Sequence, residues 1–381
     1  MLATLCGLIA LSQEGDIVQK ELPNGAKYRI ERMSDSGQVM AALYVDESNL
    51  PQDGGTSGTR HLLEHLIAKG GDRQLDRRLE SVGLSLTAFT ERDGTAFVIM
   101  GPSSQAVAAV QSLADLLEPL DVPEAELANE VKIIDQEGVF RDRFSRFLDA
   151  AWLKLFDPPV ESIHGNIGAL AQLTPADLKG AAEAYRAAGG LSVFVRGEVE
   201  PGPVSLRLQE ILGAASPGKS RYQTRNVLES IGMKETVKAK GAARAVVAAG
   251  LDRPMTLARI GVALAMQGLE PGFSTVYEPS FNRGALLLFS EDTRSFESLG
   301  KYGVGDVPRL APFVRLQAVR FVSGLLTEGP AYGALRAKQV RQAPAFKIES
   351  LRSTAVGLTD QEIWSALQDW QGGALHIGGT Q

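Results

Sequence analysis

Two of the four histidines in this chain, His61 and His65, lie four residues apart with Glu64 between them. On a helix this spacing puts both imidazoles on one face, one turn apart, where they can share a single ion. Glu64 projects beside the pair, where it can reach a water on the metal but is badly placed to be a ligand. Two neutral imidazoles, a distant carboxylate and one open position are what a hydrolytic zinc needs. The run therefore predicts metal-dependent hydrolysis.

The same run also has a simpler interpretation, as the solvated face of an ordinary helix. Four apolar residues would bury this helix with or without a metal: Leu62, Leu63, Leu66 and Ile67. A third ligand is what separates the two interpretations.

The candidate for that ligand lies on a long helix predicted to begin at Pro123, since proline is tolerated in a first helical turn. Within it Glu130 and Glu137 are seven residues apart, two turns, and therefore share a face. Glu137 is the candidate third ligand, although a glutamate on a charged helix usually lies at the surface. Three aromatic residues are expected to continue the apolar side of this helix: Phe140, Phe144 and Phe147.

The elements that must position these residues alternate between strands and helices. Strands are predicted at residues 17–22, 26–31, 38–45, 84–90, 95–100 and 191–195, the last closing the first half. Besides the histidine-bearing helix, helices are predicted at 72–82 and 103–117. Asn24-Gly25 marks a hairpin turn, Ser57 a helix N-cap and Gly70-Gly71 a helix end. His164 falls in a loop without a ligand partner at suitable spacing, which indicates a structural residue.

The second half repeats this alternation without a metal triad. Strands are predicted at residues 243–249, 274–277 and 285–290, and helices at 254–266, 309–327, 331–342 and 359–371. The expected fold class is α+β, with two related mixed α/β domains, each a mostly antiparallel sheet packed against helices. The predicted boundaries are 13–213 for the metal-binding domain, 214–228 for a linker and 229–381 for a non-catalytic domain.

Composition excludes several classes of protein. The chain has 381 residues, 44% of them hydrophobic, enough for two or more cores. Its net charge is −6 and no basic stripe is present, so nucleic acid is not an expected partner. No apolar run reaches the length of a membrane span. The single cysteine, Cys6, excludes an intramolecular disulfide and a cysteine-based zinc site.

Residues 1–12 are apolar and have the length of the hydrophobic part of a signal peptide, but no lysine or arginine precedes them. The alternatives are a first strand or an ordering tail. The stretch favours an extracytoplasmic location, periplasmic or secreted, over a cytoplasmic one.

The combination of motifs resembles the inverzincin metallopeptidases of the pitrilysin/insulinase family, and among them short bacterial members akin to mitochondrial processing peptidase. The matching stretches are residues 58–66 with Lys69-Gly70, residues 84–90 with Ala88-Phe89-Thr90, the pair Glu130 and Glu137, and the strand that begins at Leu191. The resemblance covers about the first 200 residues well and the second half only in general layout.

This resemblance implies a role for each matching residue. His61, His65 and Glu137 would bind one Zn2+ per chain, and Glu64 would be the general base of peptide-bond hydrolysis. Glu130 would support catalysis without binding the metal, since a carboxylate behind a ligating histidine fixes its orientation.

The resemblance also implies how a substrate would bind. The strand at 84–90 would be an exposed edge on which an extended peptide adds as a further strand. Its substrate-binding residues would be Leu86, Thr87, Ala88 and Phe89. The expected substrates are oligopeptides or unfolded segments, enclosed between two halves that close as a clamshell.

Some features depart from the family pattern or stay open. Thr87 stands where the family often has asparagine, and Gly138 is unusual inside a helix. Relatives hold substrate with an Arg/Tyr pair from the second half. Here two pairs qualify, and the sequence does not choose between them: Arg294 with Tyr302, or Arg283 with Tyr277.

Two further classes of function remain as alternatives. One is a non-catalytic partner or scaffold subunit of a processing-peptidase-like complex; the intact set of His61, His65, Glu137 and Glu64 argues against it. The other is a zinc hydrolase with a non-peptide substrate. The chain is expected to work alone, as a homodimer or with a related subunit.

Overall fold

The protein is described from a computed structural model. The described residues are 17–46, 58–139, 144–157, 162–218, 226–228, 232–279, 283–292, 294–327, 329–342, 348–373 and 375–380. The N-terminal stretch 1–12, the predicted N-cap Ser57 and the predicted helical residue Phe140 lie outside them. Among the described helices, none combines the length and the hydropathy that crossing a bilayer requires.

The first half is built on a six-stranded mixed sheet with the strand order β1-β2-β7-β3-β5-β4. Its strands are β1 Ile17–Glu21, β2 Lys27–Arg32, β3 Gln38–Asp46, β4 Ser85–Thr90, β5 Gly94–Pro102 and β7 Leu191–Gly197. The β1–β2 hairpin turns at Gly25, whose φ of 95° favours glycine. Strand β7, predicted to close this half, enters the middle of the sheet, where it runs parallel to β2 and antiparallel to β3.

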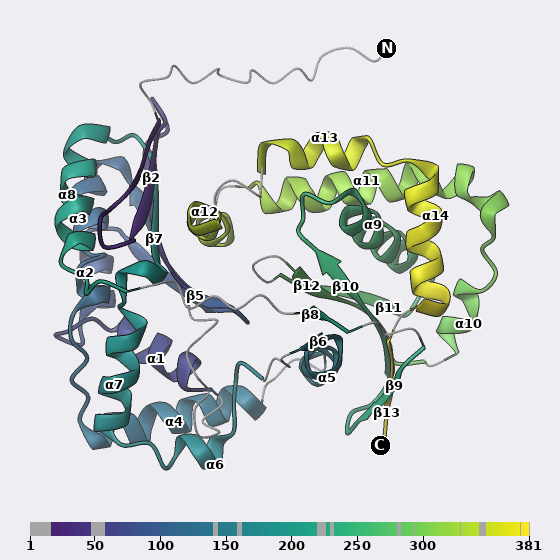
Figure 1. Cartoon of the computed structure of the whole chain (residues 1–381), viewed down its shortest axis with the longest axis horizontal. Helices are drawn as coiled ribbons and strands as arrows, with labels where there is room; N and C mark the ends of the chain where they lie inside the picture. Colours follow the sequence, from purple (N-terminus) through teal and green to yellow (C-terminus); the bar gives the residue numbers. More distant parts are fainter. Residues whose placement is uncertain are drawn as a thin grey trace.

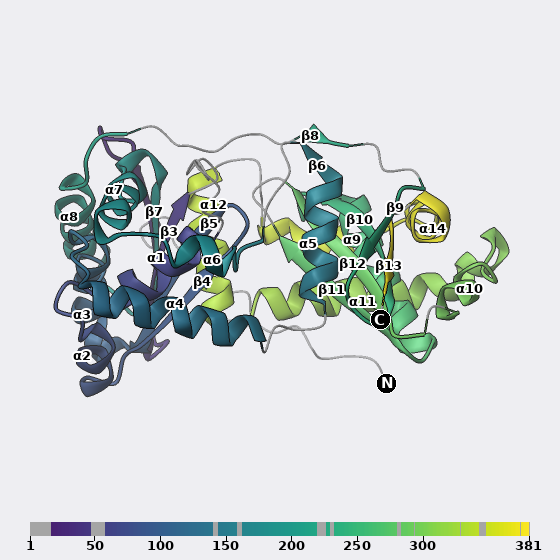
Figure 2. The same cartoon turned by 90° about the horizontal axis from the view of Figure 1, so that it is seen from below.

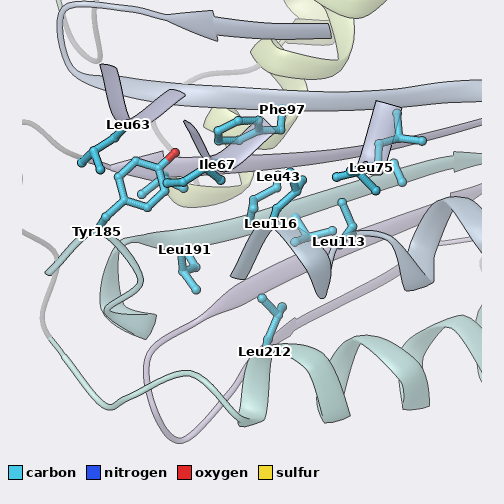
Figure 3. Packing of buried hydrophobic residues seen from close by; sticks show 14 of the residues in the cluster. Leu43, Leu63, Ile67, Leu75, Phe97, Leu113, Leu116, Tyr185, Leu191 and Leu212 are labelled. Atoms are coloured by element: carbon cyan, nitrogen blue, oxygen red, sulfur yellow. The ribbon is translucent and has the colours of Figure 1, made fainter. Parts of the chain in front are cut away.

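Helices pack on one face of this sheet and share one apolar core with it. They are α1 Thr59–Ala68, α2 Leu75–Ser81, α3 Ala106–Gln111, α4 Glu124–Val139, α6 Ile167–Leu170, α7 Pro175–Tyr185 and α8 Pro201–Gly213. Figure 3 shows Leu63 and Ile67 of α1 among the labelled residues of this core, with Phe97 of β5 and Tyr185 of α7. Because one face of α1 is buried in this core, the opposite face of the helix is directed away from the core.

The second half contains a five-stranded sheet with the order β11-β12-β10-β13-β9. Its strands are β9 Lys234–Val237, β10 Ala242–Ala249, β11 Phe273–Pro279, β12 Arg283–Ser290 and β13 Leu375–Gly379. Its helices are α9 Pro254–Leu269, α10 Ser295–Leu299, α11 Val307–Leu325, α13 Leu351–Val356 and α14 Asp360–Gln368. The first and second halves lie side by side, purple to teal and green to yellow in Figure 1.

The two sheets repeat one topology. The order β4-β5-β3-β7-β2 in the first corresponds to β11-β12-β10-β13-β9 in the second, and the strands follow one another along the chain in the same sequence. In both, the last strand of the repeat pairs parallel with the first, and the other pairings are antiparallel. The predicted α+β class with two related sheets is thus confirmed. The domain boundaries at residues 213 and 229 stay a prediction.

Each half contributes one helix to the sheet of the other. Helix α5, Ser145–Leu155, packs on the second sheet through Phe147 and Trp152. Helix α12, Pro330–Gln342, covers the face of the first sheet opposite to α1. Figures 1 and 2 both show α5 beside the green strands and α12 beside the purple ones. A short ribbon also pairs β6 Phe156–Asp157 with β8 Asn226–Val227.

Two predicted helices differ from the structure. The helix predicted over 103–117 is reduced to α3, with 3-10 turns at Ser103–Gln105 and Asp115–Leu117. The Ser112 hydroxyl bonds the Ala108 carbonyl, the kind of local bond that weakens a helix interior. The helix that follows Pro123 is described as far as Val139, and Phe147 lies in the separate helix α5, so it does not continue the apolar side of α4. Phe147 instead packs on Phe289 of the second sheet, with ring centroids 5.1 Å apart.

Candidate metal centre

Helix α1 carries the histidine pair and begins at a close backbone contact. Its N-cap is Gly58, with φ 96°, and a Cβ there would lie 2.8 Å from the carbonyl oxygen of His164 and from Cα of Gly165. Only glycine combines this left-handed conformation with such a close approach. The apolar side of the helix enters the core, which leaves His61 and His65 directed towards α4.

Three side chains from α1 and α4 converge at this point. Nε2 of His61 lies 3.2 Å from Nε2 of His65, and Oε2 of Glu137 lies 3.4 Å and 3.6 Å from these two nitrogens. Within the described part of the chain, these residues form the one group of three histidine, cysteine or acidic side chains able to hold a metal ion. The structure therefore brings together the three residues that the sequence proposes as ligands.

The spacing of these donor atoms fits a tetrahedral zinc ion. Zinc–ligand distances of about 2.0–2.1 Å place two donors of a tetrahedron about 3.3–3.4 Å apart, close to the separations in this group. His61 is 8% exposed, whereas the side chain of Glu137 is 44% exposed. The site is thus buried on the histidine side and open on the glutamate side, where a substrate could approach.

Glu130 lies behind the histidine pair. Its Oε2 is 3.2 Å from Nδ1 of His65, so a proton on Nδ1 leaves Nε2 of that ring available for a metal. Its Oε1 accepts a hydrogen bond from Nζ of Lys69, and its side chain is 2% exposed. Burial lowers the pKa of Lys69, but its contacts with Glu130 and Glu126 outweigh that and raise the pKa above its usual value. Glu130 is therefore a buried carboxyl group that pairs with Lys69 and is placed to orient His65.

Glu64 lies next to the histidines and is oriented from strand β4. The hydroxyl of Thr90 donates to Oε2 of Glu64 at 2.5 Å. Burial raises the pKa of Glu64 above its usual 4.5, while the Thr90 hydrogen bond and the proximity of His65 act in the opposite direction. A carboxylate that is held in position by a hydrogen bond and has a raised pKa has the properties of a general base.

The four residues predicted to bind substrate lie on β4, at the end of the strand order and therefore at the edge of the sheet. Leu86 and Ala88 pack towards the core that contains α1, and Phe89 packs towards α12. All four are partly exposed. Thr90, the last residue of the same strand, is the one that reaches Glu64, so the edge ends beside the candidate metal centre.

Two features of the site were not anticipated from the sequence. The ring of His164, interpreted as having no ligand-spaced histidine partner, lies edge-on to His61 with centroids 5.3 Å apart. The two histidines are 103 residues apart (164 − 61), so no local sequence pattern indicates this contact. The second feature is Arg60, which donates to the main-chain carbonyl of Arg92 in the turn after β4.

The candidate Arg/Tyr pairs of the second half have different surroundings. Arg294 is 81% exposed and pairs with Asp292, while the hydroxyl of Tyr302 donates to Glu270 at 2.8 Å. Tyr277 lies on β11 and lines a cavity together with Phe89 of β4. Tyr277 is therefore the tyrosine that the structure places beside the β4 edge. The side chain of Arg283 is outside the described parts of the chain.

The second half lacks the ligand set at the corresponding position. Helix α9 follows β10 as α1 follows β3, but it contains no histidine, cysteine or acidic residue. It packs directly on α11, where a Cβ on Gly261 would lie 2.7 Å from the Val314 carbonyl oxygen. On the corresponding edge strand β11, the main-chain N–H of Thr275 already donates a hydrogen bond to the side chain of Gln267.

Comparison with known sequences gives a family match in the first half. Residues 30–143 match the insulinase family, peptidase family M16. The chain is also 30% identical over 120 residues to the probable mitochondrial-processing peptidase subunit beta of Arabidopsis thaliana. That alignment covers 30% of this chain and 23% of the relative, so it spans about a quarter of the curated protein.

Solved structures show the same fold over nearly the whole chain. An inactive domain of an M16 peptidase from Pseudomonas fluorescens has a TM-score of 0.76 at 14% identity, covering 96% of this chain and 98% of that one. The periplasmic protease PqqL from Escherichia coli has a TM-score of 0.72 at 14% identity, covering 97% of this chain and 48% of its own. At such identities the likeness concerns the fold, and it includes an inactive domain as well as a protease.

Proposed function

Because residues 30–143 of this chain match the insulinase family of peptidases, family M16, we propose that the protein is a zinc-dependent endopeptidase. Its substrates are oligopeptides or unfolded segments of proteins. The observation that carries the proposal is the convergence of His61, His65 and Glu137 at separations of 3.2, 3.4 and 3.6 Å. A packing or scaffold role requires no such donor set.

Each residue of the site has a distinct task in this proposal. His61, His65 and Glu137 hold the metal, which when bound supplies Lewis-acid activation of water and of the scissile carbonyl. Glu64 takes a proton from the attacking water and returns it to the leaving amine. Thr90 fixes the orientation of Glu64, and Glu130 that of His65.

The substrate pairs with the edge of β4 through its main chain, which gives affinity with little demand on sequence. Leu86, Thr87, Ala88 and Phe89 are the strand residues alongside it. We also propose an extracytoplasmic location, in line with the apolar N-terminal stretch and with the periplasmic protease among the structural neighbours. Its oligomeric form is either the single chain, a homodimer or a heterodimer with a related subunit.

The test is cleavage of a panel of unstructured, quenched fluorescent peptides by the purified chain, with and without a chelator. The matched variant is Glu64→Gln, which keeps the size of the side chain and removes its basicity. The expected result is chelator-sensitive cleavage that falls by about 10²–10⁴-fold in the variant, the usual contribution of a general base. Zinc content is measured in parallel and is expected to be the same in both proteins.

The other outcomes identify the alternatives. Undiminished, chelator-sensitive cleavage by Glu64→Gln overturns the assignment of the base. A zinc-loaded chain that cleaves no peptide indicates a non-catalytic partner subunit or a non-peptide substrate. A chain that neither binds zinc nor cleaves peptides returns His61 and His65 to the role of an ordinary helix face.

A further inference from the structure

A cavity of about 210 Å³ lies on the face of the first sheet opposite to α1. It is bounded by the end of β4, by helices α11 and α12 and by β11, so both halves of the chain contribute to its wall. Its lining residues include Phe89, Glu91, Tyr277, Ala331, Leu335 and Lys338. The cavity has no part in the metal centre described above.

Strand alternation connects this cavity to the proposed substrate. Successive side chains of a strand point to opposite faces. Thr90 faces Glu64, and accordingly its neighbour Phe89 faces α12 and lines the cavity. A peptide that pairs with β4 alternates in the same way, and the side chain opposite Phe89 stands about 4.5–5.5 Å from it on the same face. That side chain is directed to the cavity, one residue away from the position beside Glu64.

The size of the cavity suits a single side chain. Pockets that enclose whole small ligands have volumes of about 300–1,000 Å³, and this one is smaller. Its walls are largely apolar, and the rings of Tyr277 and Phe321 pack edge to face with centroids 5.7 Å apart. Such walls favour an aromatic or large aliphatic group.

The charged groups of the cavity are already paired. Nζ of Lys338 lies 2.6 Å from Oε2 of Glu91 and 2.8 Å from Oδ1 of Asp93, and Asp93 also accepts a hydrogen bond from the hydroxyl of Tyr44. Burial raises the pKa of Glu91, and the neighbouring Lys338 opposes this. A charged side chain entering here would lose water without gaining a new partner, which is unfavourable.

We propose that this cavity is a specificity subsite that accepts one uncharged, non-polar side chain of a peptide paired with β4, next to the residue beside Glu64. The proposal rests on the proposed function, because it takes the β4 edge as the place where the peptide lies. It adds the chemical class of one substrate residue and the elements that select it.

The first test profiles cleavage of a peptide library by the zinc-loaded chain and two variants. The wild-type protein should select Phe, Leu or Met over Asp and Lys at one position by at least about tenfold, the discrimination expected of an apolar pocket. Leu335→Glu places a new carboxylate in the cavity and should shift the preference at that position to Lys or Arg. Leu316→Glu, at a half-exposed site elsewhere on α11, should keep the wild-type profile.

A second test measures peptide affinity in the absence of catalysis. Glu64→Gln is titrated with fluorescent peptides that differ in one residue, Phe or Asp, and anisotropy is recorded. The Phe peptide should bind about tenfold more tightly, as burial of one apolar side chain implies. Ala331→Trp, at an exposed position that lines the cavity, should remove this difference by filling the space.

The two tests separate the subsite from the catalytic function. If the chain binds the Phe peptide more tightly than the Asp peptide but cleaves no peptide, the proposed peptidase activity is overturned and the proposed subsite is retained. Cleavage with no preference at any position, a wild-type preference for Lys or Arg, or an unchanged profile in Leu335→Glu overturns the subsite and retains the peptidase. Absence of all peptide binding overturns both.

Discussion

Arg60 donates a hydrogen bond from Nη1 to the main-chain carbonyl of Arg92, at 3.1 Å, and so joins the metal helix to the turn after β4. The side chain of Arg92 is 2% exposed and extends from that turn towards the second sheet and the helix α5 that packs on it. There Nη2 lies 2.7 Å from Asp149 of α5, and Nε lies 3.2 Å from Glu278 of β11. One side chain thus connects the surroundings of the metal centre to both the exchanged helix and the second sheet.

Replacement of Arg92 by methionine should strongly destabilise the fold. Asp149 and Glu278 would lose their shared cation, and breaking a buried ion pair in this way costs about 3–5 kcal/mol. The free energy of unfolding is measured by denaturant titration. Arg294→Met is the control, because its pair with Asp292 is exposed to solvent and should contribute little to stability. Equal losses in the two variants would contradict the structural role of Arg92.

Three carboxylates on α4 should affect zinc affinity to graded extents. Glu137→Gln removes a proposed ligand and should largely abolish binding at micromolar zinc. Glu130→Gln removes the partner of His65 Nδ1 and should weaken binding by about 10–100-fold. Glu124→Gln, an exposed position on the same helix, should bind as the wild type. Competition with a chromogenic chelator measures all three, and an unchanged affinity in Glu137→Gln would exclude that residue as a ligand.

Two glycines should respond oppositely to alanine. Gly58→Ala forces a Cβ into a left-handed residue against the backbone of residues 164 and 165, and should destabilise the protein by at least about 1–2 kcal/mol. Gly138 lies in α4, and a Cβ added there would have nothing within 4 Å, so Gly138→Ala should stabilise by about 0.5–1 kcal/mol. Thermal and denaturant unfolding of the two variants provide the comparison. A stabilising Gly58→Ala would refute the close contact at the start of α1.

The stability of the protein should depend on pH through Glu126. Burial raises the pKa of this residue, but hydrogen bonds from Arg73 and Lys69 outweigh that and hold it below the usual 4.5. The native state therefore favours the ionised form, and the resulting stability is present above pH 4.5 and lost as the pH falls through the lowered pKa.

Glu126→Gln should lower the free energy of unfolding at pH 7 by up to about 1 kcal/mol, since the group is partly exposed. The difference from the wild type should shrink as the pH falls below 4.5, the usual value. Denaturant titrations across this range, with Glu124→Gln as the control, measure it. A difference that stays constant with pH would exclude the ion pair as its source.

The histidine-bearing helix could be predicted from the sequence because the residues that identify it lie close together along the chain. The spacing of His61, Glu64 and His65 and the seven-residue interval from Glu130 to Glu137 depend on helical periodicity alone. The same periodicity placed most of the predicted strands and helices within a few residues of their observed bounds, but it did not predict strands β9 and β13 or helices α5 and α8. Predicting that α1 and α4 face one another required the resemblance to a known family.

The remaining features depend on contacts between distant parts of the chain. His164 reaches His61 across a loop, and no periodic pattern connects the two. Phe147 was expected to continue the apolar side of α4, because a sequence pattern does not tell which of two cores receives an aromatic ring. The cavity at Phe89 and Tyr277 joins residues 188 positions apart (277 − 89), and its wall forms only when both halves are folded.

The exchange of α5 and α12 has a consequence for how the protein can be divided. Neither half contains all of the helices that cover its own sheet, because Phe147 and Trp152 complete the second and Tyr332 and Ala337 complete the first. A protease cut or a genetic split between residues 213 and 229 would therefore leave each fragment with an uncovered apolar sheet. Two such fragments should be insoluble apart and should recover structure only when they are produced together, each supplying the helix that the other lacks.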